Sequence, residues 1–397
     1  MKKIIRLLAL MLIPAASVIA APSVSAPEIN AASAILIDSE TGTVLFEKNA
    51  DALIPPASMT KLMTIHTALE FINDGRAAAD DLVPISANAD FRNLPPRSSL
   101  MFLEEGQRVT LMELLQGLAL PSGNDAGIAV AEYLAGSVEA FVGLMNEQAA
   151  KLGMLQTHFD DSSGLSEKNV TTAREYAEFC RYYIEKNSSR IADLHMLQSF
   201  TYPKTENLGP SGKSVHGPIT QPNHNMLIGR MASVDGLKTG YIDESGFNFA
   251  ATAVVDDRRL ILVSMGGPGS NSSDGAIKRA IDAAVLLSYG FYAWSFYQPE
   301  VPLEESVRVY GGTIDNIGLV YSPADEILIR NTNLDKLEFV RVLRPIELPV
   351  EKGSLLGRWK LMLNEEELQS GIITAAESIE KGNIFKRICD ALRKPVR

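Results

Sequence analysis

The sequence contains few residues that could form disulfides or bind a metal ion. Its only cysteines, Cys180 and Cys389, are far apart in the chain, so a disulfide framework is not indicated. None of the five histidines is paired at the spacing of a known metal motif, such as two histidines separated by three residues. These absences argue against a disulfide-stapled scaffold and against a metal site, and we expect no cofactor.

The chain also carries fewer positive than negative charges. The 37 basic residues are outnumbered by 48 acidic residues, which leaves a formal net charge of -11. Because nucleic-acid binding relies on an excess of cationic side chains, this balance predicts no nucleic-acid partner, and it disfavours a polyanionic substrate. The chain has 397 residues, of which 46% are hydrophobic, so it can build more than one domain with a substantial core.

The N-terminus lacks an apolar run long enough to span a membrane. Three basic residues precede a shorter apolar run at 7–13, and small residues follow through Ala21. This order is typical of a secretory signal peptide, which we assign to residues 1–20 with a cut that the sequence leaves open up to about residue 26. The alternative is a retained anchor, but the run is shorter than the roughly 20 residues that cross a bilayer. We therefore expect an exported protein.

Residues 27–292 combine strand and helix patterns and are expected to form one α+β domain. Strand patterns flank a four-residue loop at 39–42 and return at 238–242, 247–255 and 259–266, which predicts a single antiparallel sheet. The helices predicted from apolar residues at helical spacing begin at Ser58 or cover 111–120, 125–134, 139–152, 174–186 and 273–291.

Two segments of this domain carry more specific expectations. Residues 88–106 have no sustained period and should form an ordered loop near the first helix. The helix at 273–291 should close the domain through one face, which carries Ala276, Ile277, Ala280, Ile281, Ala284, Val285 and Ser288.

Beyond Trp294 the helical patterns give way to short strand patterns, which predict an all-β domain over 293–380. We expect this domain to act as a spacer or binding module, since no catalytic residues cluster in it. The predicted strands cover 307–310, 318–321, 326–329, 338–343 and 357–363.

The tail at 381–397 is predicted to contain an amphipathic helix. Its apolar face and its basic flanks carry Ile384, Phe385, Ile388, Leu392, Lys386, Arg387 and Arg393. This pattern fits a helix that lies on a membrane surface. It fits equally well a helix that docks on the preceding domain, and the sequence leaves both interpretations open.

The chemistry of the chain is expected at Ser58 and Lys61. Pro55 and Pro56 hold an extended approach to a helix, and residues three apart on a helix share one face. A lysine whose pKa is lowered by burial can remove the serine proton and make the hydroxyl a nucleophile. Taken alone, the pair is more often a helix-capping serine and a surface lysine.

Two further motifs favour the catalytic interpretation of Ser58 and Lys61 over the capping one. Ser122-Gly123-Asn124 follows a proline and opens a helix, and Lys238-Thr239-Gly240 reads as an edge strand whose glycine lets a ligand approach the backbone. Alone, the first motif fits a helix cap and the second a solvent-facing strand end. Together with Ser-x-x-Lys, they form the set typical of penicillin-binding proteins and the related β-lactamases.

The resemblance extends over most of residues 32–292. Stretches at 118–126, 140–146 and 234–241 are similar to the low-molecular-mass penicillin-binding proteins, which are the D-alanyl-D-alanine carboxypeptidases of peptidase family S11. The resemblance implies a serine β-lactamase/transpeptidase-like domain, with a five-stranded antiparallel sheet between helices, followed by a small all-β domain. It also implies a peripheral location on the periplasmic face of the inner membrane.

The resemblance further implies an acyl-enzyme mechanism. Ser58 would attack the penultimate D-Ala carbonyl of a peptidoglycan stem pentapeptide, with Lys61 as the base, and Ser122 would relay a proton to the leaving D-Ala. Water would then hydrolyse the ester. Penicillin and other β-lactam antibiotics would acylate the same serine as covalent inhibitors.

Substrate contacts are implied for residues of all the motifs and of one neighbouring loop, namely Asn124, Lys238, Thr239, Gly240, Tyr241 and His224. Lys238 and Thr239 would bind the substrate carboxylate, and the backbone N–H groups of Ser58 and Tyr241 would form the oxyanion hole. His224 and Pro268 stand where some relatives carry arginine. Carboxylate recognition would therefore rest more heavily on Lys238 and Thr239.

Two alternatives share this fold. A serine β-lactamase would use the same nucleophile, but it needs a group that activates the deacylating water, and no glutamate can be assigned to that task. A non-catalytic cell-wall scaffold would not need Ser58, Lys61, Ser122 and Lys238, all of which are intact. A carboxypeptidase is therefore the favoured interpretation.

Overall fold

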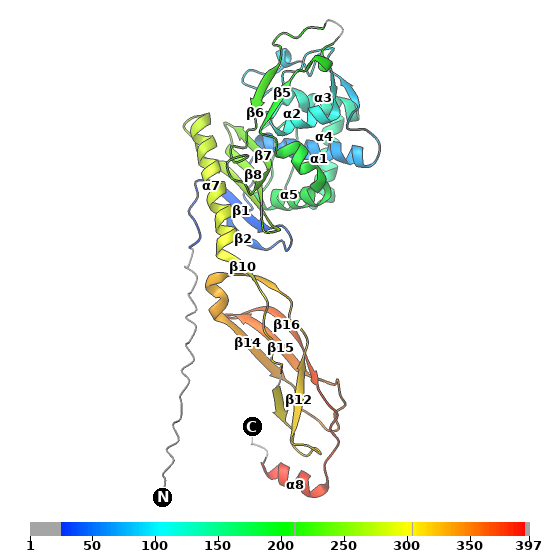
Figure 1. Ribbon diagram of the computed structural model, residues 1–397, viewed down its shortest axis with the longest axis vertical. Helices are drawn as coiled ribbons and strands as arrows, with labels where there is room; N and C mark the ends of the chain where they lie inside the picture. The colour runs from blue at the N-terminus through cyan, green and yellow to red at the C-terminus, as the bar shows by residue number, and fades with distance from the viewer. Residues whose placement is uncertain (1–24, 210–211, 304, 394–397) are drawn as a thin grey trace, which may run out of the picture. The chain divides into compact units, whose positions relative to one another are not determined.

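The computed structural model describes residues 25–209, 212–303 and 305–393 (Figure 1). The predicted signal peptide at residues 1–20 lies outside this part of the chain. The described chain divides into two compact units, one formed by Ala26–Ser295 and the other beginning at Phe296.

The first unit is built on one antiparallel sheet, as predicted. The strand order in this sheet is β2-β1-β9-β8-β7. All six residues of β1 are buried, which is expected for a strand covered on both faces. Asp256 and Asp257, with φ of 48° and 65°, form the tight turn between two of the strands. The strands are β1 (Ser33–Asp38), β2 (Val44–Lys48), β7 (Val234–Ile242), β8 (Gly246–Val255) and β9 (Arg258–Gly267).

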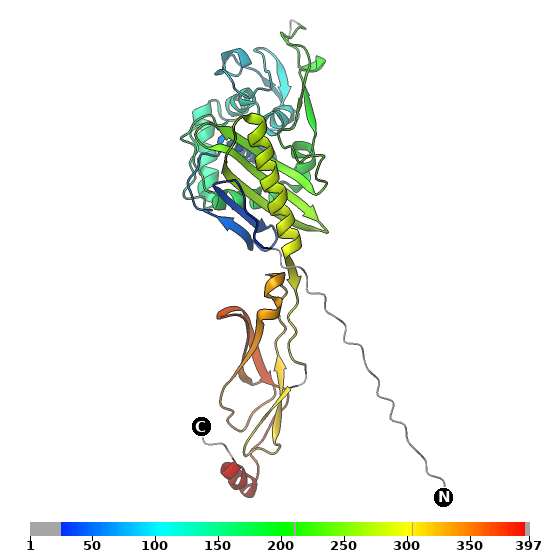
Figure 2. The same cartoon turned by 90° about the vertical axis from the view of Figure 1, so that its left-hand side faces the viewer.

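Helices cover both faces of this sheet: α7 lies on one face, and α1 and its neighbours lie on the other (Figures 1 and 2). The first ten residues of α1 are all buried, because this helix is enclosed by the other helices and the sheet. The helices are α1 (Thr60–Asn73), α2 (Leu111–Ala119), α3 (Asn124–Ala135), α4 (Val138–Lys151), α5 (Ala173–Asn187), α6 (Ile191–His195) and α7 (Ser272–Ala293).

Capping side chains set where several of these helices begin. Thr110 and Glu113 form a capping box at α2, and Ser137 and Thr172 accept backbone N–H bonds at α4 and α5. Short 3-10 turns fill the connections at η1 (Ala57–Met59), η2 (Phe91–Asn93), η3 (Ser188–Arg190) and η4 (Thr205–Asn207).

The face of α7 that packs on the sheet differs from the prediction. Ile277 and Ile281 are 45% and 53% exposed, whereas Leu286 and Leu287 are fully buried. Both faces of this helix carry apolar residues. Gly290 lies on the face that packs on the sheet, where an added Cβ would be 2.6 Å from a methyl of Leu260 on β9. The predicted packing face of α7 was therefore wrong. The helix packs on the sheet through the face where a glycine lets its backbone come close to β9, and not through the regular apolar stripe.

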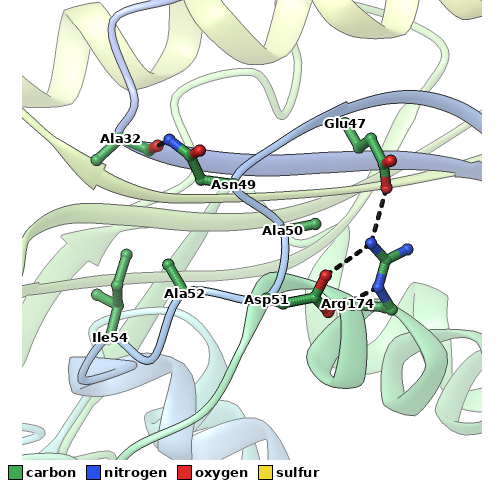
Figure 3. A pocket seen from close by; sticks show the side chains of 8 residues that line it. All are labelled: Ala32, Glu47, Asn49, Ala50, Asp51, Ala52, Ile54 and Arg174. Atoms are coloured by element: carbon green, nitrogen blue, oxygen red, sulfur yellow. Dashed lines mark hydrogen bonds and ion pairs between the residues drawn. The ribbon is translucent and has the colours of Figure 1, made fainter.

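Two small two-stranded sheets and one ion-pair cluster also belong to the first unit. The sequence did not predict the pairs β3 (Leu82–Pro84) with β4 (Arg108–Thr110) and β5 (Ser199–Tyr202) with β6 (Ile219–Pro222). Figure 3 shows Arg174 of α5 bound to Glu47 and Asp51, at 2.8 Å each, which fastens this helix to β2 and to the segment that follows it.

The second unit contains a five-stranded antiparallel sheet with the order β11-β12-β16-β15-β14. Its core is formed by Trp359, Ile317 and Ile373 with their neighbours. Short strands were predicted where the structure has β11 (Glu305–Arg308), β12 (Asn316–Tyr321), β13 (Ile327–Arg330), β14 (Leu337–Leu343) and β15 (Leu355–Leu363), whereas β16 (Glu366–Ala375) was not predicted. Strand β13 pairs with β10 (Trp294–Tyr297) outside the five-stranded sheet. The remaining elements are η5 (Asn331–Lys336) and the helix α8 (Ile384–Arg393).

The architecture is thus α+β, as the sequence predicted, with a β-rich second unit. Among the helices of the described residues, none alone is long and apolar enough to cross a bilayer. Taken together, α3 and α4 are long and apolar enough for a membrane span, but only by length and composition. The two helices are bent by 86° at the break between them.

Candidate active site

The start of α1 brings Ser58 and Lys61 together. The chain leaves Pro55 and Pro56, makes the turn η1 and enters α1 at Thr60, so the serine and lysine lie one turn apart. Lys61 Nζ is 3.0 Å from Ser58 Oγ. Lys61 is fully buried, which rules out the solvent-exposed surface lysine considered from the sequence.

Lys61 is surrounded by oxygen atoms but not by a paired carboxylate. Its Nζ also lies 2.7 Å from Asn124 Oδ1 and 2.6 Å from the carbonyl oxygen of Ser163. Burial lowers the pKa of Lys61 to about 7, although the charges of Asp161 and Asp125 partly oppose this effect. A substantial fraction of this amine is therefore neutral near pH 7 and able to accept the Ser58 proton.

Ser122 and Lys238 face each other across the same site. Ser122 adopts φ of 64°, in the left-handed region, and precedes Gly123, the N-cap of α3. Its Oγ accepts a hydrogen bond of 3.0 Å from Lys238 Nζ, which also donates to the Thr239 carbonyl oxygen at 3.0 Å. Burial, together with the positive charges of Lys61 and Arg279, lowers the pKa of Lys238 well below its ordinary value.

Gly240 allows the edge strand β7 to approach the nucleophile. An added Cβ at this position would lie 2.5 Å from the Pro56 carbonyl oxygen and 3.2 Å from Met59 N. The predicted role of Gly240, to let a ligand approach the backbone, stays a prediction, and the residue lines the pocket. Gly240 also makes room for the turn that carries Ser58. The strand and the helix start are therefore held at a fixed separation.

Two loops support the site from behind. The buried carboxylate of Asp125 accepts backbone N–H bonds from Met101, Phe102 and Leu103 at 2.8 to 3.0 Å, which fixes the end of the loop predicted at 88–106. These contacts join residues more than 20 positions apart, so the sequence pattern did not reveal them.

The second supporting loop runs along the start of α1. Asp161 accepts backbone N–H bonds from Ser163, Gly164 and Ser166, and the Ser163 carbonyl oxygen in turn accepts from Lys61. Gly164, with φ of 82°, packs directly against the backbone of Ala57 and Ser58. This loop therefore positions both the base and the nucleophile.

A pocket of about 690 Å³ opens in front of these residues. Lys61, Asn124 and Lys238 are almost fully buried behind its wall. The pocket is lined by the remaining predicted site residues, Ser58, Ser122, Thr239, Gly240, Tyr241 and His224. Arg279 of α7, Leu165 and the loop Pro95–Ser99 also line it, and none of them was predicted as a site residue.

Tyr241 and His224 lie at the rim of this pocket. The Tyr241 hydroxyl donates to Asp243 at 2.7 Å, and its ring packs 4.3 Å from that of Phe247. His224 is exposed at the opening. Desolvation is the main cause that lowers the pKa of His224 below its ordinary value, and the positive charges of Lys238, Arg279 and Lys61 add to this effect. At neutral pH this imidazole is therefore uncharged.

The chain matches the family model described as D-alanyl-D-alanine carboxypeptidase over residues 20–269. This chain belongs to that carboxypeptidase family. It is 32% identical to the D-alanyl-D-alanine carboxypeptidase DacC of Escherichia coli (strain K12), in an alignment that covers 93% of this chain and 89% of the relative. It is also 30% identical to DacF of Bacillus subtilis (strain 168), over 89% of this chain and 87% of the relative. The carboxypeptidase is therefore a serine-type hydrolase.

Solved structures support the same assignment. Penicillin binding protein 5 from Haemophilus influenzae aligns with a TM-score of 0.67 at 28% identity, covering 90% of this carboxypeptidase and all of that chain. The carboxypeptidase DacD from Francisella tularensis aligns with a TM-score of 0.74 at 24% identity, over 92% and 97% of the two chains, and shows the shared fold.

Among the described residues of this carboxypeptidase, no group of three histidine, cysteine or acidic side chains is placed to hold a metal ion. The polar groups at Ser58 are instead those of a serine hydrolase: a nucleophile, an amine base, a second hydroxyl and a buried lysine. This arrangement can transfer an acyl group to serine.

Proposed function

We propose that the enzyme removes the terminal D-Ala from peptidoglycan stem pentapeptides through an acyl-enzyme intermediate on Ser58. The observation that carries this proposal is the 3.0 Å separation of Lys61 Nζ and Ser58 Oγ. Because the pKa of Lys61 is lowered to about 7, its neutral amine can take the serine proton at physiological pH.

In the proposed first step, Ser58 Oγ bonds to the penultimate D-Ala carbonyl carbon while its proton passes to Lys61. The backbone N–H groups of Ser58 and Tyr241 would stabilise the oxyanion that forms. The C–N bond then breaks, and Ser122 delivers a proton to the departing amine. Lys238 supports this relay, since its Nζ lies 3.0 Å from Ser122 Oγ. Water finally hydrolyses the ester and frees Ser58.

Substrate binding is proposed along the edge of the sheet. Strand β7 pairs with β8 on one side only, so its outer edge can pair with an extended peptide. Thr239 and Gly240 lie on this strand and line the pocket, and Asn124 lies behind it next to Lys61. We assign Asn124, Lys238, Thr239, Gly240, Tyr241 and His224 to substrate binding.

β-Lactams are the proposed covalent inhibitors. Penicillin-Binding Protein D2 from Listeria monocytogenes, solved in its cefotaxime-bound form, aligns with a TM-score of 0.57 at 26% identity over 67% of this chain. A β-lactam presents its strained amide carbonyl to the same serine. Among the residues that the structure describes, no carboxylate bonds directly to Lys61 or Ser58, which favours a long-lived acyl-enzyme over rapid β-lactamase turnover.

The function is tested by intact mass and by product release. Incubation with penicillin should add the mass of one penicillin to the wild type and none to Ser58→Ala. In a separate assay, the wild type should release D-Ala from a soluble pentapeptide and Ser58→Ala should not. An adduct that survives in Ser58→Ala, or an unmodified wild type, would refute the assignment of the nucleophile.

We also propose export and peripheral attachment to the periplasmic face of the inner membrane through α8. The apolar residues of α8 are exposed: Phe385 by 78% and Leu392 by 85%. The polar side of the helix meets the β-rich unit, because Asp390 accepts from the Gly311 N–H at 2.9 Å and Lys386 pairs with Asp315 at 2.5 Å. The helix is thus docked through polar contacts, which leave its apolar stripe available to a lipid surface.

A further inference from the structure

His195, the last residue of α6, is a buried histidine that contacts the edge strand of the active site. Its side chain is 1% exposed, and it meets β7 at Leu237, the residue before Lys238. None of the roles assigned above uses this imidazole. Buried polar groups are normally hydrogen-bonded, so the partners of His195 indicate what the ring holds in place.

The partners of the imidazole fix which ring nitrogen carries the proton. Nδ1 of His195 is 3.2 Å from the Leu237 carbonyl oxygen, which can only accept a hydrogen bond. Nδ1 therefore carries the proton and donates to Leu237. In the neutral ring Nε2 is then an acceptor, and the Tyr183 hydroxyl, 2.8 Å away, donates to it. The hydrogen bonds run in one direction, from Tyr183 through His195 to the backbone of β7.

The ring is neutral at physiological pH. Desolvation by burial lowers the pKa of His195 to about 4 against the opposing effect of the Leu237 bond, and the positive charge of Lys238 lowers it further. Burial also raises the pKa of Tyr183, so its hydroxyl keeps the proton that it donates. A neutral imidazole holds the Leu237 carbonyl without adding a second positive charge near Lys238.

Two carbonyl groups of β7 accept from side chains in this way. Strand β7 lies at the edge of the sheet, and carbonyls two residues apart on such a strand face the same side. The Leu237 carbonyl accepts from His195, and the Thr239 carbonyl accepts from Lys238 Nζ at 3.0 Å. Lys238 lies between these residues and also donates to Ser122 Oγ. A shift of the strand at Leu237 would therefore move the amine relative to the hydroxyl that relays the proton.

The loop after β6 ties down the same region. Asn223 Nδ2 donates to the carbonyl oxygen of His195 at 3.0 Å, and Asn225 Nδ2 donates to the carbonyl oxygen of Gly236 at 3.1 Å. The backbone that carries the imidazole and the backbone of β7 are thus held by one loop. The bond from His195 to Leu237 spans two segments whose separation is already fixed.

We infer that His195 is a positioning residue, which holds the Leu237 carbonyl and thereby keeps the Lys238 amine within reach of Ser122. This inference rests on the proposed function, in which Lys238 supports the proton relay. The imidazole is enclosed and acts on the reaction only through Lys238. If the bond served the fold alone, its loss would lower stability, and its effect on the reaction would not depend on Lys238.

Nitrogen-15 NMR of the histidine-labelled enzyme tests the hydrogen bonds. Two-bond nitrogen–proton correlations distinguish the two neutral tautomers of histidine, and the His195 signals are identified by their loss in His195→Asn. We expect the Nδ1–H tautomer at neutral pH. The Nε2–H tautomer would overturn the inference, because Nδ1 could not then donate to Leu237.

Penicillin acylation rates test the consequence for the reaction. His195→Leu removes the donor, and acylation should slow by about 10²-fold, the effect that a misplacement of about 1 Å can have. His195→Asn keeps a donor near the position of Nδ1 and should recover most of this loss. His66→Leu is the matched control. His66 is also buried, with its ring centre 6.4 Å from that of Tyr183, but its nitrogens have no hydrogen-bond partner among the described residues. Its acylation rate should equal that of the wild type.

A double-mutant cycle with Lys238→Ala separates positioning from general damage. Because His195 acts through Lys238, His195→Leu should cause no further slowing in the Lys238→Ala enzyme, with thermal unfolding followed in parallel. Equal slowing in both backgrounds, or an unchanged rate in His195→Leu, would overturn the inference and leave the hydrolase function intact. A wild type that forms no penicillin adduct and releases no D-Ala would instead refute the proposed function itself.

Tyr183→Phe keeps the inference testable if His195→Leu does not fold. This change deletes one hydroxyl and leaves Nε2 of His195 without its donor, so the ring loses one of its two anchors. Acylation should slow several-fold in the otherwise wild-type enzyme and not at all in Lys238→Ala. The same slowing in both backgrounds, or none in either, would contradict the inference.

Discussion

Gly164 packs so closely on Ala57 that an added Cβ would be 1.9 Å from the Ala57 carbonyl oxygen. Gly164 also has φ of 82°, in the region that disfavours other residues. Because Ala57 immediately precedes Ser58, the tip of the supporting loop sets the position of the nucleophile. The contact joins two segments that are more than 100 residues apart.

Gly164→Ala should therefore damage both stability and acylation. The left-handed φ alone costs about 1–2 kcal/mol, and the clash with Ala57 adds to that cost by moving the turn. Gly153→Ala is the control, since Gly153 has φ of 74° but no atoms within 4 Å of an added Cβ. Chemical denaturation and penicillin acylation rates should separate the two: Gly153→Ala should lose about 1–2 kcal/mol and keep its acylation rate. Equal acylation by both variants would show that the loop does not position Ser58.

Acylation should depend on pH through Lys61. Only the neutral amine can accept the Ser58 proton, and its pKa is lowered to about 7. The acylation rate should therefore be low at acid pH, rise about tenfold per pH unit toward pH 7, and level off above it. Stopped-flow acylation by penicillin across this range gives the profile. Lys61→Ala should remove the pH dependence and slow acylation by about 10²–10⁴-fold, whereas an unchanged rate would point to another base.

Asp125→Asn should destabilise the first unit. The buried carboxylate of Asp125 accepts the backbone N–H groups of Met101, Phe102 and Leu103, and an amide would direct its own N–H donors at one or more of them. We expect a loss of about 2–3 kcal/mol in the free energy of unfolding. The exposed Asp80 provides the control, and Asp80→Asn should change stability by no more than about 0.5 kcal/mol. A neutral result for Asp125→Asn would mean that the loop holds its shape without this charge.

Ile388→Glu should weaken membrane binding without affecting catalysis. Ile388 is 56% exposed on the apolar stripe of α8, and a charge there opposes insertion into a lipid surface. Sedimentation with phosphatidylglycerol vesicles should fall by at least about tenfold, as it should when residues 383–397 are deleted. Cleavage of a soluble pentapeptide should persist.

The matched control for the tail is Ile372→Glu. Ile372 is 47% exposed and lies in the same unit, on the strand β16 instead of on α8. It should sediment like the wild type. If Ile388→Glu also sediments like the wild type, the helix serves only as a docked end of the β-rich unit.

Local patterns in the sequence predicted much of the fold. The period of apolar residues located the central sheet and most helices, and the spacing of Ser58 and Lys61 on one helical face predicted a contact that lies at 3.0 Å. Strand β16 was missed because its first half, beginning at Glu366, is polar and partly exposed. The face of α7 was misassigned because both of its sides are apolar.

Long-range contacts in the site could not be predicted in this way. Gly164 and Asp125 act on loops that are distant in sequence, and no periodic pattern links them to Ser58. Arg279 was overlooked because a single arginine on a predicted helix usually faces solvent. Only the structure shows that Arg279 and Ala276, one turn apart on α7, both line the pocket.

Ser122 keeps its hydroxyl at the site while holding a backbone shape that glycine would adopt at lower cost, since its φ is 64°. Ser122→Gly would relieve about 1–2 kcal/mol of strain and, in the same change, delete the group that contacts Lys238. Selection for heat resistance alone would thus favour a slower enzyme. Thermostability and turnover are opposed at this single position, so variants chosen for robustness need to be screened for D-Ala release as well.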